Sequence, residues 1–233
     1  MTVEPIFTHA WDISPAEAQE IQRQLRGRVL VEPLDHQPEI IAGVDVSVKS
    51  EQARAAVVLL SYPDLVPFQA TTAEMPLSFP YVPGLLAFRE GPVTLAALEQ
   101  LEDRPDVLMF DAQGLAHPRR MGLATHLGVL LDTPAVGCAK SRLCGAYMEP
   151  NEQKGSWTPL IDRGEVIGAV VRTRDGVRPV FVSTGHRVDL KAAVALVLDC
   201  ATRYRLPEPT RWAHRVAGGE PLPPTRQPTL FDL

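Results

Sequence analysis

Residues 39–49 read EIIAGVDVSVK, a run rich in β-branched side chains that predicts a β-strand. Two further runs of this kind follow closely, ARAAVVLLSY at 53–62 and a third within 66–75. Because the segments between these runs are short, we expect the three strands to form an antiparallel meander. Asp45 is the acid in the interior of the first strand, where its neighbours are otherwise apolar.

The order of the next elements predicts the fold class. We expect a helix at 92–101, then a strand at 105–112, PDVLMFDA, whose apolar run is typical of a strand buried on both faces. A helix at 118–131 and a short strand at 133–136 complete a parallel crossover. This order is that of the ribonuclease H-like fold, in which three antiparallel strands are followed by a helix, a strand, a helix and a strand. We therefore expect an α/β protein with a mixed central sheet flanked by helices, although fold order alone does not establish function.

The rest of the chain predicts further elements and a tail. The expected elements are a helix capped by Ser14 with Pro15 and Glu17 in its first turn, strands at 166–172 and 179–182 around a turn at Asp175-Gly176, and a helix at 190–204. After Ala217 the sequence becomes GGEPLPPTRQPTLFDL, which has little apolar content. We expect one domain over residues 1–217 and a flexible, proline-rich tail over 218–233.

The composition is that of an ordinary globular protein, with 45% hydrophobic and 22% charged residues among 233. The three cysteines, Cys138, Cys144 and Cys200, form no CxxC pair, which argues against a disulfide scaffold or a zinc site and for a reducing compartment. The sequence shows neither a signal-peptide core nor an apolar run of membrane-spanning length. These features predict a cytoplasmic protein without a membrane partner.

The distribution of charge matters more here than its sum. A formal net charge of -5 speaks against nucleic-acid binding when it is taken alone. However, residues 111–147 hold four Lys and Arg against two acids, and residues 203–226 hold five arginines against two acids. These segments are consistent with a basic face on an acidic protein, and equally with ordinary solvated surface charge.

Three acidic residues fall in adjacent predicted elements. Asp45 lies inside the first strand, Asp111 ends the fourth strand, and Glu90 lies near the expected start of the helix at 92–101. A carboxylate in a core strand is costly unless it is paired or binds a metal. If the two strands are neighbours, both aspartates meet at one point, and oxygen ligands of this kind suit Mg²⁺ or Mn²⁺. Taken singly, Asp111 can instead end a strand or cap a turn, and Glu90 can simply favour a helix N-terminus.

The stretch FPYVPGLLAFREGP at 79–92 predicts a stiff loop. Phe79 and Val82 each precede a proline and are therefore pushed towards extended conformations. The Pro-Gly pair after Val82 is the signature of a type II turn. Tyr81 is thus carried on a bent, rigid segment, either as a packed loop aromatic or as a wedge that enters a stack of nucleic-acid bases.

The chain resembles the endonuclease V family, nucleases that act on inosine in DNA and, in some members, in RNA. The stretches that carry the resemblance are IAGVDVS (41–47), FPYVPGLLAFREGP (79–92), PDVLMFDAQGLAHPRRMGLATHLG (105–128), GCAKSRLCG (137–145), IGAVVRT (167–173), FVSTGHRVD (181–189) and EPTRWAH (208–214). They span most of the chain in the order of the family.

The resemblance implies roles for individual residues. The metal ligands would be Asp45 and Asp111 together with the catalytic Glu90, and the other catalytic-site residues would be Lys140 and His214. The wedge would be formed by Pro80, Tyr81, Val82 and Pro83, and the base pocket by the backbone near Gly84, Leu86 and Gly114. His117 would lie beside the bound nucleic acid. His186 lies in another matching stretch and would help to close the site. One departure is Ala112, where the family is expected to have glycine, and its methyl group would crowd the base pocket and lower selectivity for inosine.

The resulting expectation is a Mg²⁺-dependent repair endonuclease that Mn²⁺ also supports. It would flip out hypoxanthine in deoxyinosine-containing DNA and cut the second phosphodiester bond on the 3′ side, leaving 3′-hydroxyl and 5′-phosphate ends. The alternatives are an inosine-specific endoribonuclease and a ribonuclease H-like binding module without catalysis. The three retained acids argue against the binding module.

The tail holds one more motif, QPTLFDL at 227–233. Gln227, Leu230 and Phe231 resemble the short peptide by which bacterial replication and repair proteins dock on the sliding clamp. Two apolar anchors on an extended segment suit such a contact. The alternatives are a terminal latch on the nuclease domain and a chance match.

Overall fold

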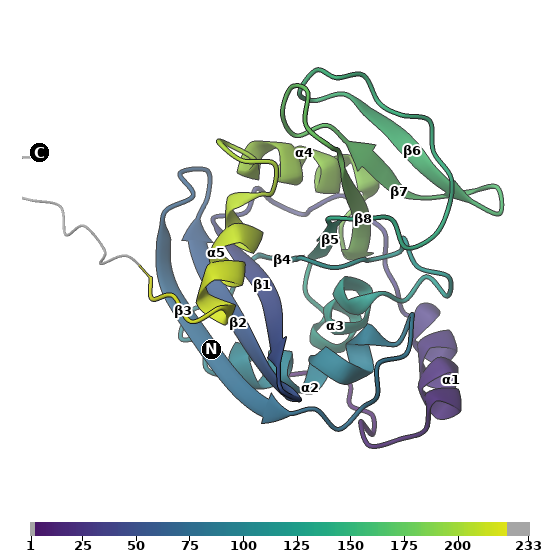
Figure 1. Ribbon diagram of the computed structural model, residues 1–233, viewed down its shortest axis with the longest axis vertical. Coiled ribbons are helices and arrows are strands. Elements are labelled where there is room, and N and C mark those ends of the chain that lie inside the picture. The colour runs from purple at the N-terminus through teal and green to yellow at the C-terminus, as the bar shows by residue number, and fades with distance from the viewer. Residues whose placement is uncertain (1–2, 223–233) are drawn as a thin grey trace, which may run out of the picture.

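The computed structural model describes residues 3–222, so the tail motif at Gln227, Leu230 and Phe231 lies outside the described residues. The strands are β1 (Ile40–Lys49), β2 (Gln52–Ser61), β3 (Pro67–Pro76), β4 (Val107–Phe110), β5 (Ala135–Ala139), β6 (Trp157–Asp162), β7 (Glu165–Val171) and β8 (Val180–His186). The helices are α1 (Pro15–Arg26), α2 (Leu86–Leu98), α3 (Leu123–Leu131), α4 (Leu190–Cys200) and α5 (Glu208–Ala217). The eight strands form one mixed sheet in the order β3-β2-β1-β4-β5-β8-β7-β6 (Figure 1).

The sheet confirms the predicted fold class. Strands β1, β2 and β3 pair antiparallel as a meander, and β4 pairs parallel to β1. Strand β5 is parallel to β4, and β8 returns antiparallel to β5. The first five strands therefore have the order 3-2-1-4-5 expected of a ribonuclease H-like protein.

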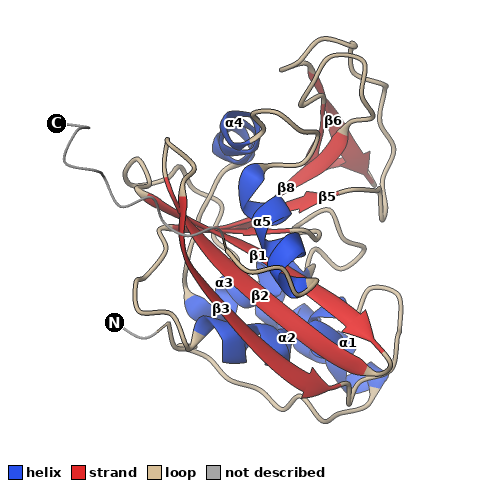
Figure 2. Ribbon diagram, turned by 60° about the vertical axis from the view of Figure 1, so that its left-hand side comes forward, coloured by secondary structure: helices blue, strands red, loops and turns tan. Residues whose placement is uncertain are grey.

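Helices cover both faces of the sheet (Figure 2). On one face α2 and α3 pack over a core that includes Val57, Leu108 and Phe110. On the other face α4 packs against β7 and β8, while α5 lies across β1 and β2. Burial on both faces explains why β4 reads as a continuous apolar run.

Helix α5 approaches β1 unusually closely. A Cβ atom on Gly43 would lie 1.8 Å from the carbonyl oxygen of Pro209, so only glycine fits at this position of the strand. Because side chains alternate along a strand, Gly43 and Asp45 share the face that α5 covers. The close approach therefore brings the C-terminal helix next to the carboxylate of Asp45.

Two helix starts differ from the prediction. Helix α2 begins at Leu86 rather than at Pro92, so Glu90 lies within the helix and not at its mouth. Proline favours the first turn of a helix, but Pro92 lies in the interior of α2, where its missing N–H removes one backbone hydrogen bond. Helix α3 begins at Leu123 rather than at 118, because residues 118–122 form a loop in which Arg120 has a φ of +57°.

Two elements were not predicted, strand β6 and helix α5. Strand β6 is an edge strand with an exposed, proline-containing sequence, so it lacks the alternating or continuous apolar pattern of the other strands. Helix α5 begins Glu-Pro-Thr-Arg and buries only a narrow apolar stripe against β2. Because its sequence is predominantly polar, its composition does not predict a helix with an apolar face.

The three cysteines, Cys138, Cys144 and Cys200, are free thiols in the structure. Within residues 3–222, none of the helices has the length and apolar character needed to span a bilayer.

Candidate active site

A cavity of about 470 Å³ opens where the parallel pairing of β1 and β4 ends, between the loop that carries Tyr81 and the segment after β5. Its lining includes most of the residues singled out in the sequence: Asp45, Tyr81, Val82, Pro83, Gly84, Leu86, Glu90, Asp111, His117, Lys140 and His214. Pro80 and Gly114 are not among the lining residues. Gly114 is instead packed against β8, where its N–H donates to Ser183 Oγ at 2.9 Å.

The parallel pairing of β1 and β4 brings the two aspartates together. Val44 is opposite Phe110 in the register, so Asp45 and Asp111 are the next residues on the two strands. The N–H of Asp111 donates to the carbonyl oxygen of Val44 at 3.1 Å, which continues the ladder by one bond. This juxtaposition is the one that the sequence predicted on the condition that the strands were neighbours.

A basic or imidazole side chain contacts each of these carboxylates. His214 Nδ1 lies 2.7 Å from Asp45 Oδ2, and Lys140 Nζ forms an ion pair with Asp111 Oδ2. One ligand atom from each of Asp45, Asp111 and His214 lies within 4.8 Å of the others. Within the described residues these three side chains are close enough to hold a metal ion together, and Glu90 lies outside that distance.

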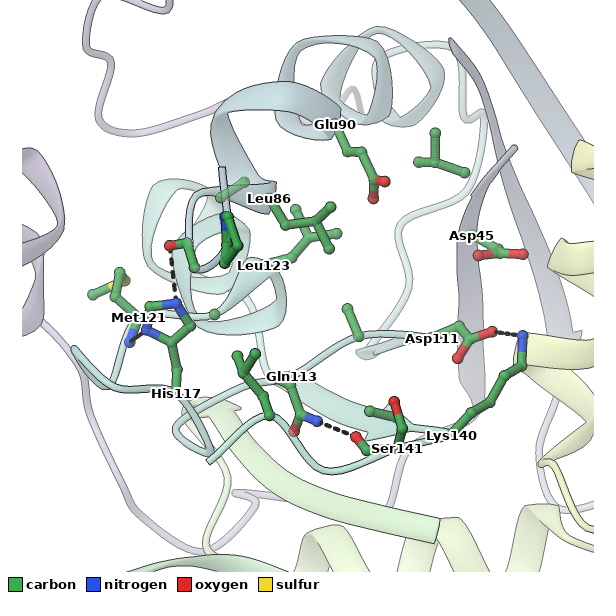
Figure 3. Close-up of a pocket in the computed structure, with 18 of the residues that line it drawn as sticks. Asp45, Leu86, Glu90, Asp111, Gln113, His117, Met121, Leu123, Lys140 and Ser141 are labelled. Carbon is green, nitrogen blue, oxygen red and sulfur yellow. Dashed lines mark hydrogen bonds and ion pairs between the residues drawn. The ribbon is translucent and has the colours of Figure 1, made fainter. Parts of the chain in front are cut away.

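Glu90 reaches the same cavity from the opposite wall, on helix α2, and its carboxyl group points towards the aspartates (Figure 3). Behind it the helix is tightly packed, because a Cβ on Gly91 would lie 2.8 Å from the indole of Trp11. Burial and the nearby charge of Asp45 raise the pKa of Glu90 to about 8, with a smaller contribution from Asp111. Among the described residues Glu90 forms no ion pair, and the packing of Gly91 against Trp11 fixes the helix backbone beside it.

The convergence of three carboxyl groups favours a bound cation. Burial, followed by the charge of Asp111, raises the pKa of Asp45 above its usual range, while the hydrogen bond from His214 opposes this shift. Carboxylates that resist ionisation in this way are stabilised by a positive ion among them. Carboxylate oxygens with water and phosphate are the ligands that Mg²⁺ prefers, so the donors fit a divalent metal.

The loop before α2 has the predicted turn. The N–H of Leu85 donates to the carbonyl oxygen of Val82 at 2.9 Å, and Gly84 has a φ of +80°, as a type II turn requires. The Tyr81 side chain at the tip is 74% exposed, whereas Phe79 at the start of the loop is buried. The tyrosine therefore stands in solvent at the rim of the cavity rather than packing on the loop.

His117, His186 and Ala112 are all buried. The ring of His117 is engaged with the Gly84 turn, since its Nε2 lies 2.9 Å from the carbonyl oxygen of Gly84. His186 lies outside the cavity lining and contacts Asp132 Oδ1 at 3.1 Å. Ala112 does line the cavity, so its methyl group is in a position to affect what binds there.

Sequence reasoning missed several residues that shape the site. Gln113 lines the cavity, donates to the carbonyl oxygen of Ser141 at 2.8 Å, and leaves its own side-chain oxygen without a partner among the described residues. Arg119 and Gln22 both contact the Gly84 turn. The motif around His117 contains Arg119, but nothing in the pattern of the N-terminal helix distinguishes Gln22 from an ordinary surface glutamine.

Comparisons with known proteins agree with this geometry. A sequence model of the family described as Endonuclease V matches residues 23–215. The endonuclease V of Methanothrix thermoacetophila is 55% identical over 206 residues, which cover 88% of this chain and 92% of that protein. The endonuclease V of Roseiflexus sp. is 49% identical over 217 residues, which cover 93% of this chain and 98% of that protein.

Solved structures show the same fold. The crystal structure of the endonuclease V from Streptomyces avermitilis superposes with a TM-score of 0.86 at 42% identity, covering 94% of this chain and 96% of that chain. The Ciona intestinalis endonuclease V, in complex with a 24mer DNA containing an inosine followed by a ribo-adenosine, has a TM-score of 0.75 at 30% identity, covering 87% of this chain and 95% of that chain. With a family match over most of its length and a carboxylate cluster at the end of its central strands, this chain belongs to the endonuclease V family of nucleases.

Proposed function

We propose that this protein is a metal-dependent DNA repair endonuclease that recognises deoxyinosine. In this proposal it flips hypoxanthine into the cavity and hydrolyses the second phosphodiester bond on its 3′ side, leaving 3′-hydroxyl and 5′-phosphate ends. The observation that carries the proposal is the convergence of Asp45, Asp111 and Glu90 on one cavity beside an exposed, rigidly held Tyr81. The inosine-containing DNA bound by the Ciona relative supports the choice of substrate.

The carboxylates have a defined part in this chemistry. A divalent cation, Mg²⁺ or Mn²⁺, bound by the oxygens of Asp45 and Asp111 would activate water and stabilise the leaving oxygen. His214 holds Asp45 Oδ2 in place, and Glu90 on the facing wall is placed to orient a water molecule. Lys140 presents a compact positive charge at the cavity edge, which suits a phosphate oxygen of the substrate.

The loop at Tyr81 accounts for recognition in the same proposal. Flipping a base requires unstacking that costs a few kcal/mol, and an aromatic side chain in the gap returns about 1–3 kcal/mol. A side chain on a rigid turn loses little conformational entropy when it inserts. The cavity walls formed by Gly84 and Leu86 lie directly beside the wedge and are suited to receive the base.

One assay tests the proposal. Labelled oligonucleotides with one inosine or one adenosine at the same position are prepared as single-stranded and duplex DNA and as RNA, and incubated with Mg²⁺ or with EDTA. The expected result is a single nick one nucleotide beyond the inosine. It should occur in DNA that contains inosine, and in the presence of Mg²⁺ but not of EDTA. Preferential cutting of inosine RNA would favour the endoribonuclease, whereas binding without cutting would favour a non-catalytic module.

We also propose the bacterial sliding clamp as a partner of the tail. The support is the sequence of residues 227–233 alone, with Gln227 setting the register and Leu230 and Phe231 as apolar anchors. Such a contact would deliver the nuclease to newly copied DNA.

A further inference from the structure

Three side chains converge on one backbone oxygen at the turn behind Tyr81. The carbonyl oxygen of Gly84 accepts hydrogen bonds from Arg119 Nη2 at 2.7 Å, His117 Nε2 at 2.9 Å and Gln22 Nε2 at 3.0 Å. The bond from His117 is among those drawn in Figure 3. A carbonyl oxygen has two lone pairs, so three donors saturate it and hold the turn firmly.

The tautomer of His117 fits this arrangement. The backbone N–H groups of Arg119 and Met121 point at His117 Nδ1 from 3.1 and 3.4 Å, so Nδ1 is the acceptor and Nε2 carries the proton. Burial, with the charge of Arg119, lowers the pKa of His117 to about 4, and the ring stays neutral near neutral pH. His117 is therefore a fixed donor to Gly84.

Gln22 ties this group to helix α1. Its side chain is 1% exposed, and its Nε2 donates to the carbonyl oxygens of Gly84 and Met121, each at 3.0 Å. Its Oε1 accepts from Arg119 Nε at 2.5 Å. Both donors and the acceptor of the amide are used, and exchanging its oxygen and nitrogen would break all three bonds, so its partners fix the orientation of the amide.

The other end of the same loop is anchored independently. Phe79 is 3% exposed, and its carbonyl oxygen accepts from Arg89 Nη1 at 3.0 Å. The segment between Phe79 and Gly84 is thus fixed at both ends, and only its tip is free. The direction in which Tyr81 points is set by these two anchors, since its own side chain is 74% exposed.

We infer that Gln22 is a positioning residue for base flipping: by holding the Gly84 turn, it holds Tyr81 in the orientation that enters a duplex. This inference rests on the proposed function, in which Tyr81 is the wedge. Gln22 lies outside the cavity lining, so it acts through the turn rather than through contact with nucleic acid. Its loss should therefore affect duplex opening and leave the hydrolytic step intact.

The test compares Gln22→Met with Gln24→Met on the same helix, where Gln24 is exposed and its side-chain amide donates to Glu20 on the helix surface. Nicking is measured under single-turnover conditions on inosine duplex and on the single strand of identical sequence. A 2-aminopurine base beside the inosine reports unstacking by its fluorescence. We expect Gln22→Met to lose about tenfold in nicking of the duplex, with a smaller fluorescence rise, and Gln24→Met to match the wild type.

A double-mutant cycle separates positioning from a general loss of structure. If Gln22 acts through Tyr81, Gln22→Met has no further effect on the duplex-to-single-strand ratio in a Tyr81→Ala background. If Gln22→Met melts well below the wild type, the same measurements are made on Gln22→Glu. This variant keeps the side-chain shape and the contact with Arg119 but loses both donors at neutral pH. Equal losses on duplex and single strand, or full additivity with Tyr81→Ala, would overturn the inference. A wild-type enzyme that ignores inosine would instead overturn the proposed function.

Discussion

The Nδ1 atom of His214 lies 2.7 Å from Oδ2 of Asp45, a contact that joins two residues 169 positions apart. It links the first strand of the sheet to helix α5 at the edge of the cavity. The contact depends on the close approach of α5 to Gly43, which no side chain larger than hydrogen would permit. The candidate catalytic centre thus combines residues from the first strand and the last helix of the described chain.

Replacing either aspartate should remove catalysis and leave binding. We expect Asp45→Asn or Asp111→Asn to lower the nicking rate by at least about a hundredfold, because each change weakens the cation site. Binding of inosine DNA, measured by fluorescence anisotropy, should persist because the Tyr81 loop is untouched. Asp64→Asn, at an exposed turn, is the control. Full activity of either active-site variant would exclude the metal assignment.

Lys140→Met should lower turnover more than affinity. Lys140 pairs with Asp111 at the cavity edge, where its charge would meet a phosphate oxygen as negative charge develops during hydrolysis. We expect kcat to fall by about tenfold to a hundredfold with little change in KM. The exposed Lys49→Met variant serves as the control. An effect on KM alone would make Lys140 a simple backbone contact.

Tyr81→Ala should impair nicking of inosine duplex more than nicking of the single strand. Only the duplex must be unstacked and unpaired, and the wedge offsets that cost by about 1–3 kcal/mol. We expect kcat/KM on the duplex to drop by about tenfold or more, and Tyr81→Phe, which keeps the ring, to retain most of it. Equal losses of Tyr81→Ala on both substrates would argue against a wedge.

His126 should make stability fall at acid pH. Burial, with nearby His9 and His117, lowers the pKa of His126 to about 3, from an unfolded value near 6.5. Between these values the unfolded chain binds more protons than the folded chain, so the free energy of unfolding decreases as pH falls from 6.5 towards 3. One such proton contributes a slope of up to about 1.4 kcal/mol per pH unit.

Urea unfolding of the wild type and of His126→Phe at pH 7.5, 6.0, 5.0 and 4.5 measures this slope. The variant loses the 2.7 Å contact between His9 and His126, which changes its stability at every pH. The free energy of unfolding of each protein is therefore compared with its own value at pH 7.5. We expect a shallower decline with acidification in His126→Phe, with a residual slope from His117, whose pKa is lowered to about 4. Parallel declines in the two proteins would contradict the assignment.

The tail is expected to bind a bacterial sliding clamp. A peptide of residues 222–233 should bind with micromolar affinity, corresponding to about -8 kcal/mol, in isothermal titration. In the full chain, Leu230→Ala with Phe231→Ala should abolish clamp binding and leave nicking of short oligonucleotides unchanged. No measurable heat for the wild-type peptide, or loss of nicking in the double variant, would favour the alternative of a terminal latch.

Much of the fold could be read from local patterns, because they report local physical requirements. Runs rich in β-branched residues predict β1 and β2, and a continuous apolar run predicts β4, since a strand covered on both faces admits few polar residues. Acids within or at the end of such runs indicate functional residues, here Asp45 and Asp111, because an unpaired buried carboxylate is costly. The Pro-Gly pair after Val82 specified the turn, since only glycine adopts its positive φ without strain.

Other features depended on contacts between distant segments. The start of α2 was misplaced because Pro92 is a local signal for a first turn, and the packing of the helix on β2 and β3 overrides it. The sequence does not predict helix α5, because its narrow apolar stripe is stabilised by packing against Ala56 and Val58 of β2. Local periodicity carries no information about which surface a segment will meet.

The sequence by itself therefore determined the class of the sheet and the types of residue at the candidate catalytic centre. Only the tertiary structure brings a ring nitrogen of His214 within 4.8 Å of carboxylate oxygens of Asp45 and Asp111, while Glu90 lines the same cavity from helix α2. Only the tertiary structure showed that Gln22, buried on a helix of unremarkable sequence, holds the turn behind Tyr81. The physical reason is that hydrogen bonds and ion pairs depend on distances between atoms. For residues far apart in the chain, those distances are set by packing of the whole domain.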